Sequence, residues 1–224
     1  QTVTPSFEDV LTSEERGRVL WRASVNDRTD PQVHSAIYTY DWNGDYDNPV
    51  LNKVSIQPFV NNDPTEPVGN TNWQKELYKT GLVYQNDLTI STGNDKSGLL
   101  INLGYLKNSG TMVYTNFEKI STRINAFTTF FKGKVKVGEN LMIALTKQRL
   151  QAMDIGGAPT PILGVILAPT IPVYKTDGSF AGPAGAGYTD RNNPVDMQYQ
   201  NRWDNTSLMN LFGNIYLEAS LAKN

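Results

Sequence analysis

The chain has 224 residues, a formal net charge of −2 at pH 7 and no cysteine. A weakly acidic chain with scattered Lys and Arg side chains lacks the basic surface that nucleic-acid binding requires. Without cysteine it cannot form disulfide scaffolds, thiol nucleophiles or Cys-ligated metal clusters. The most apolar stretch, residues 161–173, is interrupted by Pro and Gly and is too short for a membrane-spanning helix, which takes about 20 apolar residues.

Residues 1–81 are expected to form a long excursion with short helices and many turns. Thr12 and Glu15 have the spacing of a capping box, which predicts a helix over residues 13–25. A second short helix is predicted near Trp73. Between the two helices we expect loops, because this part is rich in turn and helix-breaking pairs: Asp30-Pro31, Asn43-Gly44, Asn48-Pro49 and Asp63-Pro64.

One of these loops resembles the start of a calcium-binding loop. Oxygen-bearing side chains stand at every second position: Asp41, Asn43, Asp45 and Asp47. The EF-hand pattern requires glycine at its sixth position and glutamate at its twelfth, whereas here Gly44 stands fourth and Asn52 stands twelfth. A solvated turn is therefore favoured over a metal site, and no metal or other cofactor is predicted.

Residues 82–148 contain four segments in which apolar and polar residues alternate. Successive side chains of a strand point to opposite faces, so each predicted strand has an apolar and a polar face. The apolar positions include Leu82, Tyr84, Leu88, Ile90, Leu99, Ile101, Leu103, Tyr105, Ile120, Ile124, Phe130, Val135, Val137, Leu141, Ile143 and Leu145. Polar positions on the third segment include Lys119, Arg123 and Asn125.

The rest of the chain is expected to hold a second excursion and a fifth strand. Residues 149–207 are rich in Gly, Pro and Asn, and a loop of this length usually serves binding. In residues 208–224 the alternation returns, with Met209, Leu211, Ile215, Leu217 and Leu221 on one face.

The length and alternation of the five segments indicate the wall of an outer-membrane barrel. About 9–11 tilted residues of a strand cross a bilayer, and barrel strands alternate lipid-facing apolar with lumen-facing polar side chains. Short and long connections also alternate, as they do at the two ends of such a barrel. We therefore predict a mainly β fold: an antiparallel meander of barrel-wall strands, forming an incomplete barrel, with two long, partly helical loop excursions. Outer-membrane lipid would contact the apolar face, and Lys119, Arg123 and Asn125 would face the lumen.

Binding is favoured over catalysis. His34 is the only histidine, so conventional catalytic triads and His-based metal sites lack parts. Aromatic residues of the excursions stand among Asn, Asp and Arg, a mixture suited to stacking on sugar rings and hydrogen-bonding their hydroxyl groups. The candidate ligand-contacting residues are Trp42, Tyr46, Tyr188, Tyr199 and Trp203. Packing of the loops against each other is the alternative role of these rings.

An ordered set of motifs resembles the SusC/RagA-like TonB-dependent transporters. Trp73–Leu77, Asn86–Gly93 and Ile101–Tyr105 are similar to the early barrel of that family. Lys119–Asn125 and Leu141 are similar to the strands that follow in it. Further segments resemble loops of the family: Leu11–Asn52, Ala168–Tyr174, Asp177-Gly178 and Asn193–Val195.

The resemblance implies import of oligosaccharides, or in some members peptides, across a Gram-negative outer membrane. It also implies energy from TonB, acting through a plug region, and a SusD-like surface lipoprotein that caps the barrel. Members of the family are several times longer, so we expect this chain to be a fragment that lacks the plug and most of the strands. The excursions, residues 1–81 and 149–207, are then expected to be extracellular.

Two other classes remain open. A soluble carbohydrate-binding β-module would also use alternating strands and aromatic loops, and it would be stable in water without detergent. A secreted glycosidase fragment is less favoured, because catalysis would need two carboxyl groups placed across a cleft, which no pair of neighbouring acids in the sequence establishes.

Overall fold

The computed structural model of the protein describes residues 1–153, 157–182 and 191–220. Two predicted positions, Tyr188 and Leu221, lie outside the described residues. The chain divides into two compact units, each assembled from separate stretches of sequence. The sheet unit consists of residues 1–4, 80–150 and 202–224, and the loop unit consists of residues 5–79 and 151–201.

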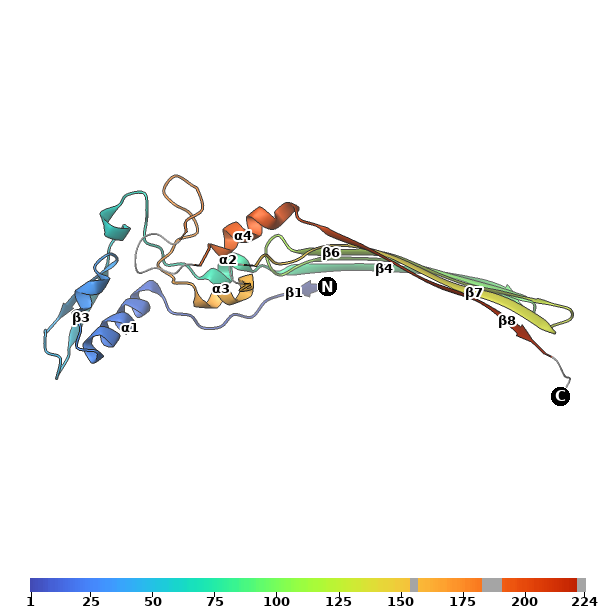
Figure 1. Ribbon diagram of the computed structural model, residues 1–224, viewed down its shortest axis with the longest axis horizontal. Coiled ribbons are helices and arrows are strands. Elements are labelled where there is room, and N and C mark those ends of the chain that lie inside the picture. The colour runs from blue at the N-terminus through green and yellow to red at the C-terminus, as the bar shows by residue number, and fades with distance from the viewer. Residues whose placement is uncertain (154–156, 183–190, 221–224) are drawn as a thin grey trace. The chain divides into compact units, whose positions relative to one another are not determined.

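The sheet unit is a six-stranded sheet with the strand order β1-β4-β5-β6-β7-β8, in which every neighbouring pair is antiparallel (Figure 1). Its long strands are β4 (Gly81–Asn94), β5 (Ser97–Ser109), β6 (Asn116–Phe130), β7 (Val135–Arg149) and β8 (Thr206–Ala219). These five strands confirm the predicted alternating segments. The short strand β1 (Thr2–Val3) pairs with the beginning of β4 and was not predicted.

The register keeps apolar side chains opposite one another across the sheet. Leu103 pairs with Leu88 and Thr122, and Ile143 pairs with Thr122 and Leu211. All of these residues therefore lie on one face, as predicted. The apolar face consists of Leu82, Tyr84, Leu88, Ile90, Leu99, Ile101, Leu103, Tyr105, Ile120, Ile124, Phe130, Val135, Val137, Leu141, Ile143, Leu145, Met209, Leu211, Ile215 and Leu217.

The other side of the sheet, called the polar face below, carries amide, hydroxyl and charged side chains together with several apolar ones. Its polar members are Gln85, Asp87, Thr89, Asn102, Lys119, Ser121, Arg123, Asn125, Lys136, Asn140, Asn210, Asn214 and Glu218.

The two ends of the sheet differ in their connections. At one end, Asn94 Oδ1 closes a tight turn from β4 to β5 by accepting bonds from the Lys96 and Ser97 amides at 2.8 and 3.0 Å. Residues 131–134 join β6 to β7 at the same end, with Phe131 and Lys132 at φ of 51° and 55°. The longer connections, residues 110–115 and 150–205, leave from the opposite end. The alternation of short and long connections is therefore present.

In the loop unit, helix α1 (Ser13–Asn26) begins with both halves of the predicted capping box, Thr12 and Glu15. It is followed by η1 (Pro31–His34) and by a hairpin of β2 (Tyr38–Trp42) and β3 (Leu51–Ile56). The sequence predicted loops between the two helices, and for residues 38–56 this prediction was wrong. The hairpin forms there because alternate residues of β2, Tyr38 and Tyr40, are buried in a core shared with α1. The shared core consists of Trp21, Val25, Ile37, Tyr38, Tyr40 and Val54.

The two excursions of the sequence, residues 1–81 and 149–207, contact each other within the loop unit through backbone and side-chain hydrogen bonds. The helical elements involved are α2 (Trp73–Leu77), α3 (Thr160–Ile166) and α4 (Pro194–Gln200), with η2 (Val60–Asn62) as a single 3₁₀ turn. A further 3₁₀ turn, η3 (Asn201–Trp203), begins at the last residue of the loop unit and continues into the sheet unit. Trp73 is 2% exposed, and its Nε1 donates to the Ala168 carbonyl at 3.1 Å. The Gly69 and Thr71 amides donate to the carbonyls of Thr170 and Pro169, both at 2.8 Å.

None of the helices in the described part of the chain has the length and apolar character that crossing a membrane would take.

Candidate functional site

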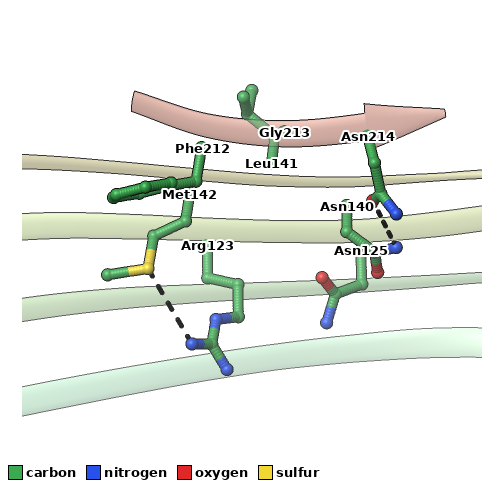
Figure 2. A pocket seen from close by; sticks show the side chains of 8 residues that line it. All are labelled: Arg123, Asn125, Asn140, Leu141, Met142, Phe212, Gly213 and Asn214. Atoms are coloured by element: carbon green, nitrogen blue, oxygen red, sulfur yellow. Dashed lines mark hydrogen bonds between the residues drawn. The ribbon is translucent and has the colours of Figure 1, made fainter. Parts of the chain in front are cut away.

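The polar face contains a shallow hollow of about 510 Å³ over strands β6, β7 and β8. Two of the predicted lumen-facing residues, Arg123 and Asn125, line it from β6. Four further side chains line it from the neighbouring strands: Asn140 and Met142 from β7, and Phe212 and Asn214 from β8 (Figure 2). The third predicted residue, Lys119, lies on the same face but does not line the hollow.

The floor of the hollow follows from the register of the three strands. Asn125 pairs with Asn140, which pairs with Asn214, so three side-chain amides form one row across the sheet. Within this row, Asn140 Nδ2 donates to Asn214 Oδ1 at 2.9 Å. An amide group carries two donor hydrogens and two acceptor lone pairs, so the row keeps unused donors and acceptors facing the hollow.

The next row of the sheet places a cation beside sulfur and an aromatic ring. Arg123 pairs with Met142, which pairs with Phe212. The guanidinium contacts the Met142 sulfur at 3.9 Å (Figure 2). Within the described residues no carboxylate lies within ion-pairing distance of Arg123. Most of the five guanidinium N–H donors are therefore available to a ligand.

A second hollow, of about 280 Å³, lies beside the first on the same side of the sheet. Here rings lie over glycines on the neighbouring strands: a Cβ at Gly98 would meet the Phe127 ring at 2.5 Å, and a Cβ at Gly138 would meet the Tyr216 ring at 2.3 Å. Lys136 Nζ lies 4.9 Å from the centre of the Phe127 ring and 3.9 Å from Glu218 Oε2. Unlike Arg123, this cation has a carboxylate within ion-pairing distance.

The predicted ligand-contacting aromatics of the first excursion serve packing in the structure. Trp42 lies edge-on to Trp21, with ring centres 6.0 Å apart, and edge-on to Tyr46 at 5.2 Å. Both Trp42 and Tyr46 pack against the core of the loop unit. Contact of these two rings with a ligand stays a prediction.

The aromatics near the second excursion differ from one another. Tyr199 packs against Phe180, with ring centres 5.4 Å apart, and Phe180 packs against Tyr174 at 5.1 Å. Trp203 is 78% exposed, and the Arg202 guanidinium lies 5.4 Å from its ring centre. Trp203 therefore has the most accessible ring among the described candidates.

The oxygens of the calcium-loop candidate are used to build the turn between β2 and β3. Asn43 Oδ1 accepts from the amides of Asp45 and Val50 at 3.3 and 3.0 Å. The amides of Asn48 and Asp47 donate to Asp45 Oδ1 and hold the pKa of this carboxyl below its ordinary value. Asp47 pairs with Arg28, and Asp41 accepts from Asn52 at 3.3 Å. The described residues contain no group of three or more His, Asp or Glu side chains placed to share a metal ion.

The apolar face has a charged border near the end with long connections. Lys107, Glu118 and Lys147 form one row across β5, β6 and β7. Tyr105 Oη donates to Glu118 Oε1 at 2.8 Å, and the Tyr84 ring lies 6.2 Å from the Tyr105 ring. Tyrosines and charges that border an apolar band are typical of the interfacial region of a membrane barrel.

Several residues of the hollow were not predicted from the sequence. Asn140, Met142, Phe212 and Asn214 have the parity of the polar face, but parity alone does not say which strands are neighbours or which residues pair. The register supplies this information, because it brings residues 89 positions apart, Arg123 and Phe212, into one row.

Comparisons with known proteins identify related sequences. No protein-family model matches the chain. The chain is 28% identical over 116 residues to TonB-dependent receptor P3 of Formosa agariphila and 25% identical over 118 residues to TonB-dependent receptor SusC of Bacteroides thetaiotaomicron. These matches cover 50% and 52% of the chain but only 12% and 11% of the two receptors.

The fold is similar to that of a chain in the RagAB peptide transporter, with a TM-score of 0.62 at 16% identity over 99% of this chain and 25% of that chain. A second structure, the RagAB peptide importer in its closed-closed state, gives a TM-score of 0.51 at 19% identity over 70% of this chain and 18% of that chain. The chain thus resembles SusC/RagA-like TonB-dependent transporters, and its mainly β, incomplete-barrel fold agrees with this resemblance.

Proposed function

We propose that the chain forms part of the wall and the external loops of a TonB-dependent outer-membrane importer of the SusC/RagA-like type. The observation that carries this proposal is the sheet of five long antiparallel strands with one mainly apolar face and an opposite, more polar face. Soluble sheets bury their apolar face against a core. Here side chains of that face are open on the inner strands of the sheet, with Leu103 42%, Ile120 52% and Leu145 48% exposed. Lipid is the environment that fits such a face.

In this proposal the polar face lines the lumen and the loop unit is extracellular. Arg123, Asn125 and Lys119 then face the lumen, or the plug region, and the tight turns at residues 95–96 and 131–134 lie on the periplasmic side. The Lys107, Glu118 and Lys147 row would lie at the outer boundary of the lipid. Support for this orientation comes from the connections, because short turns are periplasmic and long loops extracellular in outer-membrane barrels.

The proposed activity is uptake rather than catalysis. The cargo is proposed to be an oligosaccharide, captured with a SusD-like surface lipoprotein and imported with energy from TonB through a plug region. Similarity to a receptor named SusC supports this partner class, and similarity to chains of a transporter named as a peptide importer makes peptides the alternative cargo.

Cell fractionation with an antibody raised against this chain tests the proposal. We expect the native polypeptide in the outer membrane, in a band that migrates faster when it is not boiled, because a folded barrel remains compact in detergent. A soluble polypeptide of about 24.9 kDa would contradict the proposal and favour a free carbohydrate-binding β-module.

A further inference from the structure

The charged border of the apolar face has alternating signs of charge. Lys107 of β5 pairs with Glu118 of β6, which pairs with Lys147 of β7, so an ammonium, a carboxylate and a second ammonium follow one another across three strands. Neighbouring strands lie about 4.8 Å apart, and this spacing separates each backbone position of the row from the next. Both lysines are exposed and Glu118 is partly buried, so the row is accessible to whatever covers this face.

The three charges do not neutralise one another through direct ion pairs. Within the described residues no carboxylate oxygen lies within ion-pairing distance of the Lys107 or Lys147 ammonium. Glu118 is bound by a neutral group instead, because Tyr105 Oη donates to its Oε1 at 2.8 Å. In the part of the chain that the structure describes, Glu118 Oε2 accepts from no donor. Two ammonium groups and one carboxylate oxygen are therefore left to bind a ligand.

The row lies where the apolar band ends. On the same strands, the next residues of this face toward the tight turns are Tyr105, Ile120 and Leu145. Ile120 is 52% exposed and Leu145 is 48% exposed. Toward the long connections the next row holds Arg149, whose Nη1 already donates to the Arg202 carbonyl. Unpaired charges and open apolar side chains therefore meet at this row.

A molecule that covers both regions has an apolar part and a headgroup with charges of both signs. The long apolar stem of a lysine lies along apolar surface while its ammonium reaches the water boundary, where it binds a phosphate. A purely anionic headgroup attracted to both lysines would also approach the Glu118 carboxylate. A headgroup with a phosphate and a primary ammonium instead offers each charge of the row its opposite. A phosphoethanolamine group also spans a distance similar to the spacing of neighbouring strands.

We infer that Lys107, Glu118 and Lys147 form a binding site for the phosphoethanolamine headgroup of a membrane lipid. The phosphate binds a lysine, the ammonium binds Glu118, and the acyl chains lie along Ile120 and Leu145. The inference deepens the proposed function and rests on it, because the row contacts lipid only if the apolar face lies in the outer membrane.

Native mass spectrometry of the purified protein of full natural length, in detergent, tests the inference with two lipids that have the same acyl chains. Dioleoyl phosphatidylethanolamine carries a phosphate and an ammonium, whereas dioleoyl phosphatidylglycerol carries the phosphate alone. The measured quantity is the ratio of the two dissociation constants for the first lipid bound. We expect the natural protein to bind phosphatidylethanolamine about fivefold more tightly than phosphatidylglycerol.

The variant Glu118→Gln is expected to reverse this preference, because it removes the partner of the ammonium and the repulsion of the anionic lipid. The double variant Lys107→Gln, Lys147→Gln should weaken binding of both lipids about fivefold or more. Lys119→Gln is the matched control, because Lys119 neighbours Glu118 on β6 but points to the polar face. It should bind both lipids like the natural protein.

The inference would be overturned by a natural protein that binds phosphatidylglycerol as tightly as phosphatidylethanolamine or more tightly. It would equally be overturned by a Glu118→Gln variant that keeps the natural ratio, since the row then serves only to stabilise the sheet. Heat-modifiable migration of each variant checks that the barrel is folded. Failure of the proposed function is recognised independently by fractionation: an outer-membrane protein without this lipid preference removes only the lipid site, whereas a soluble protein removes both.

Discussion

Two tryptophans of the excursions differ in what surrounds their rings. Trp42 lies between Trp21 and Tyr46 and packs against the core of the loop unit. Trp203 is 78% exposed, and the Arg202 guanidinium lies 5.4 Å from the centre of its ring. The first ring therefore contributes to packing, whereas the second is exposed to solvent and accessible to a ligand.

Replacing Trp203 with Ala is expected to weaken cargo binding by about 0.5–1.5 kcal/mol, the energy typical of one aromatic stacking contact, without changing folding. Trp42→Ala should instead destabilise the loop unit by about 3 kcal/mol, because it leaves a cavity beside Trp21. Calorimetry and limited proteolysis measure the two effects. Normal cargo affinity in Trp203→Ala would remove this residue from the binding surface.

His34 is expected to make the stability of the loop unit depend on pH. Partial burial, together with the positive charge of Arg16, lowers the pKa of His34 below its ordinary value of about 6.5. Its Nε2 lies 3.2 Å from Ser24 Oγ. The charged ring is disfavoured in the folded state, so the folded state binds fewer protons than the unfolded state between the two pKa values.

We therefore expect the loop unit to keep its full stability above about pH 6.5 and to lose part of it as the pH falls through the pKa of folded His34. Because His34 is the only histidine, its ring protons can be followed in an NMR titration without further assignment. His34→Gln should make protease resistance independent of pH in this range. A measured pKa above 6.5 would contradict the prediction.

At the scale of elements, α1 and the hairpin β2–β3 approach closely through a glycine. A Cβ at Gly17 would meet the Tyr38 ring at 2.7 Å and Val54 Cγ1 at 2.8 Å, and Tyr38 is 0% exposed. A buried ring and a β-branched side chain have no open space to move into. Only a residue without a side chain therefore permits this packing distance.

Gly17→Val should destabilise the loop unit by about 1–3 kcal/mol, the range seen for overpacked cores. Arg22→Val is the matched control, because it places the same residue at an exposed position of the same helix. Protease resistance of residues 13–56 measures the difference. Equal resistance of the two variants would mean that α1 and the hairpin do not depend on this contact.

The long strands test the assignment of the two faces. Ile90 and Ser91 are adjacent on β4 and point to opposite faces. Ile90→Lys would place a charge in the apolar face, where lysine at the middle of a bilayer costs about 2–4 kcal/mol. Ser91→Lys would place the same charge in the lumen at little cost.

We expect Ile90→Lys, and similarly Ile143→Lys on β7, to reduce the amount of assembled barrel, with Ser91→Lys close to the natural protein. The heat-modifiable band on an unboiled gel reports assembly. Normal assembly of both isoleucine variants would show that this face does not meet lipid.

The sequence predicts the long strands well because their signal is local. The period of two between Leu82 and Leu145 is a property of each strand by itself. The hairpin β2–β3 was missed although Tyr38, Tyr40 and Trp42 alternate with polar residues, because a five-residue strand is short and the turn residues around it dominate the pattern. Strand β1 has two residues and no pattern at all.

The candidate site is predictable only in part, because a local sequence pattern shows the face on which a residue lies but not which residues of other strands lie beside it. Arg123 and Asn125 were assigned to the polar face from parity alone. The row Asn125–Asn140–Asn214 depends on the register of β6, β7 and β8, and β8 enters the sheet after an excursion of more than fifty residues. Side-chain packing of Trp42 likewise depends on α1, which no local pattern near residue 42 reveals.

At the scale of the whole molecule, the sheet is not closed by the described residues. On the outer edge of β4, strand β1 covers only Gly81 and Leu82, and β8 has a strand partner on one side only. Unpaired strand edges and an exposed apolar face both promote aggregation in water. An experiment on aggregation of this chain must therefore distinguish the effect of the edges from the effect of the apolar face.

We expect the 224-residue chain to aggregate in buffer and to become dispersed, with its strands formed, in detergent micelles. The variant Leu103→Lys, Ile143→Lys, Leu211→Lys charges a line across the middle of the apolar face and leaves the edges unchanged. If the face causes aggregation, this variant stays soluble without detergent; if the edges cause it, the variant aggregates like the natural chain. Light scattering with circular dichroism distinguishes these results. If the natural chain is monomeric and folded in plain buffer, its apolar face is stable in contact with water. That result would contradict the proposal that this face contacts lipid.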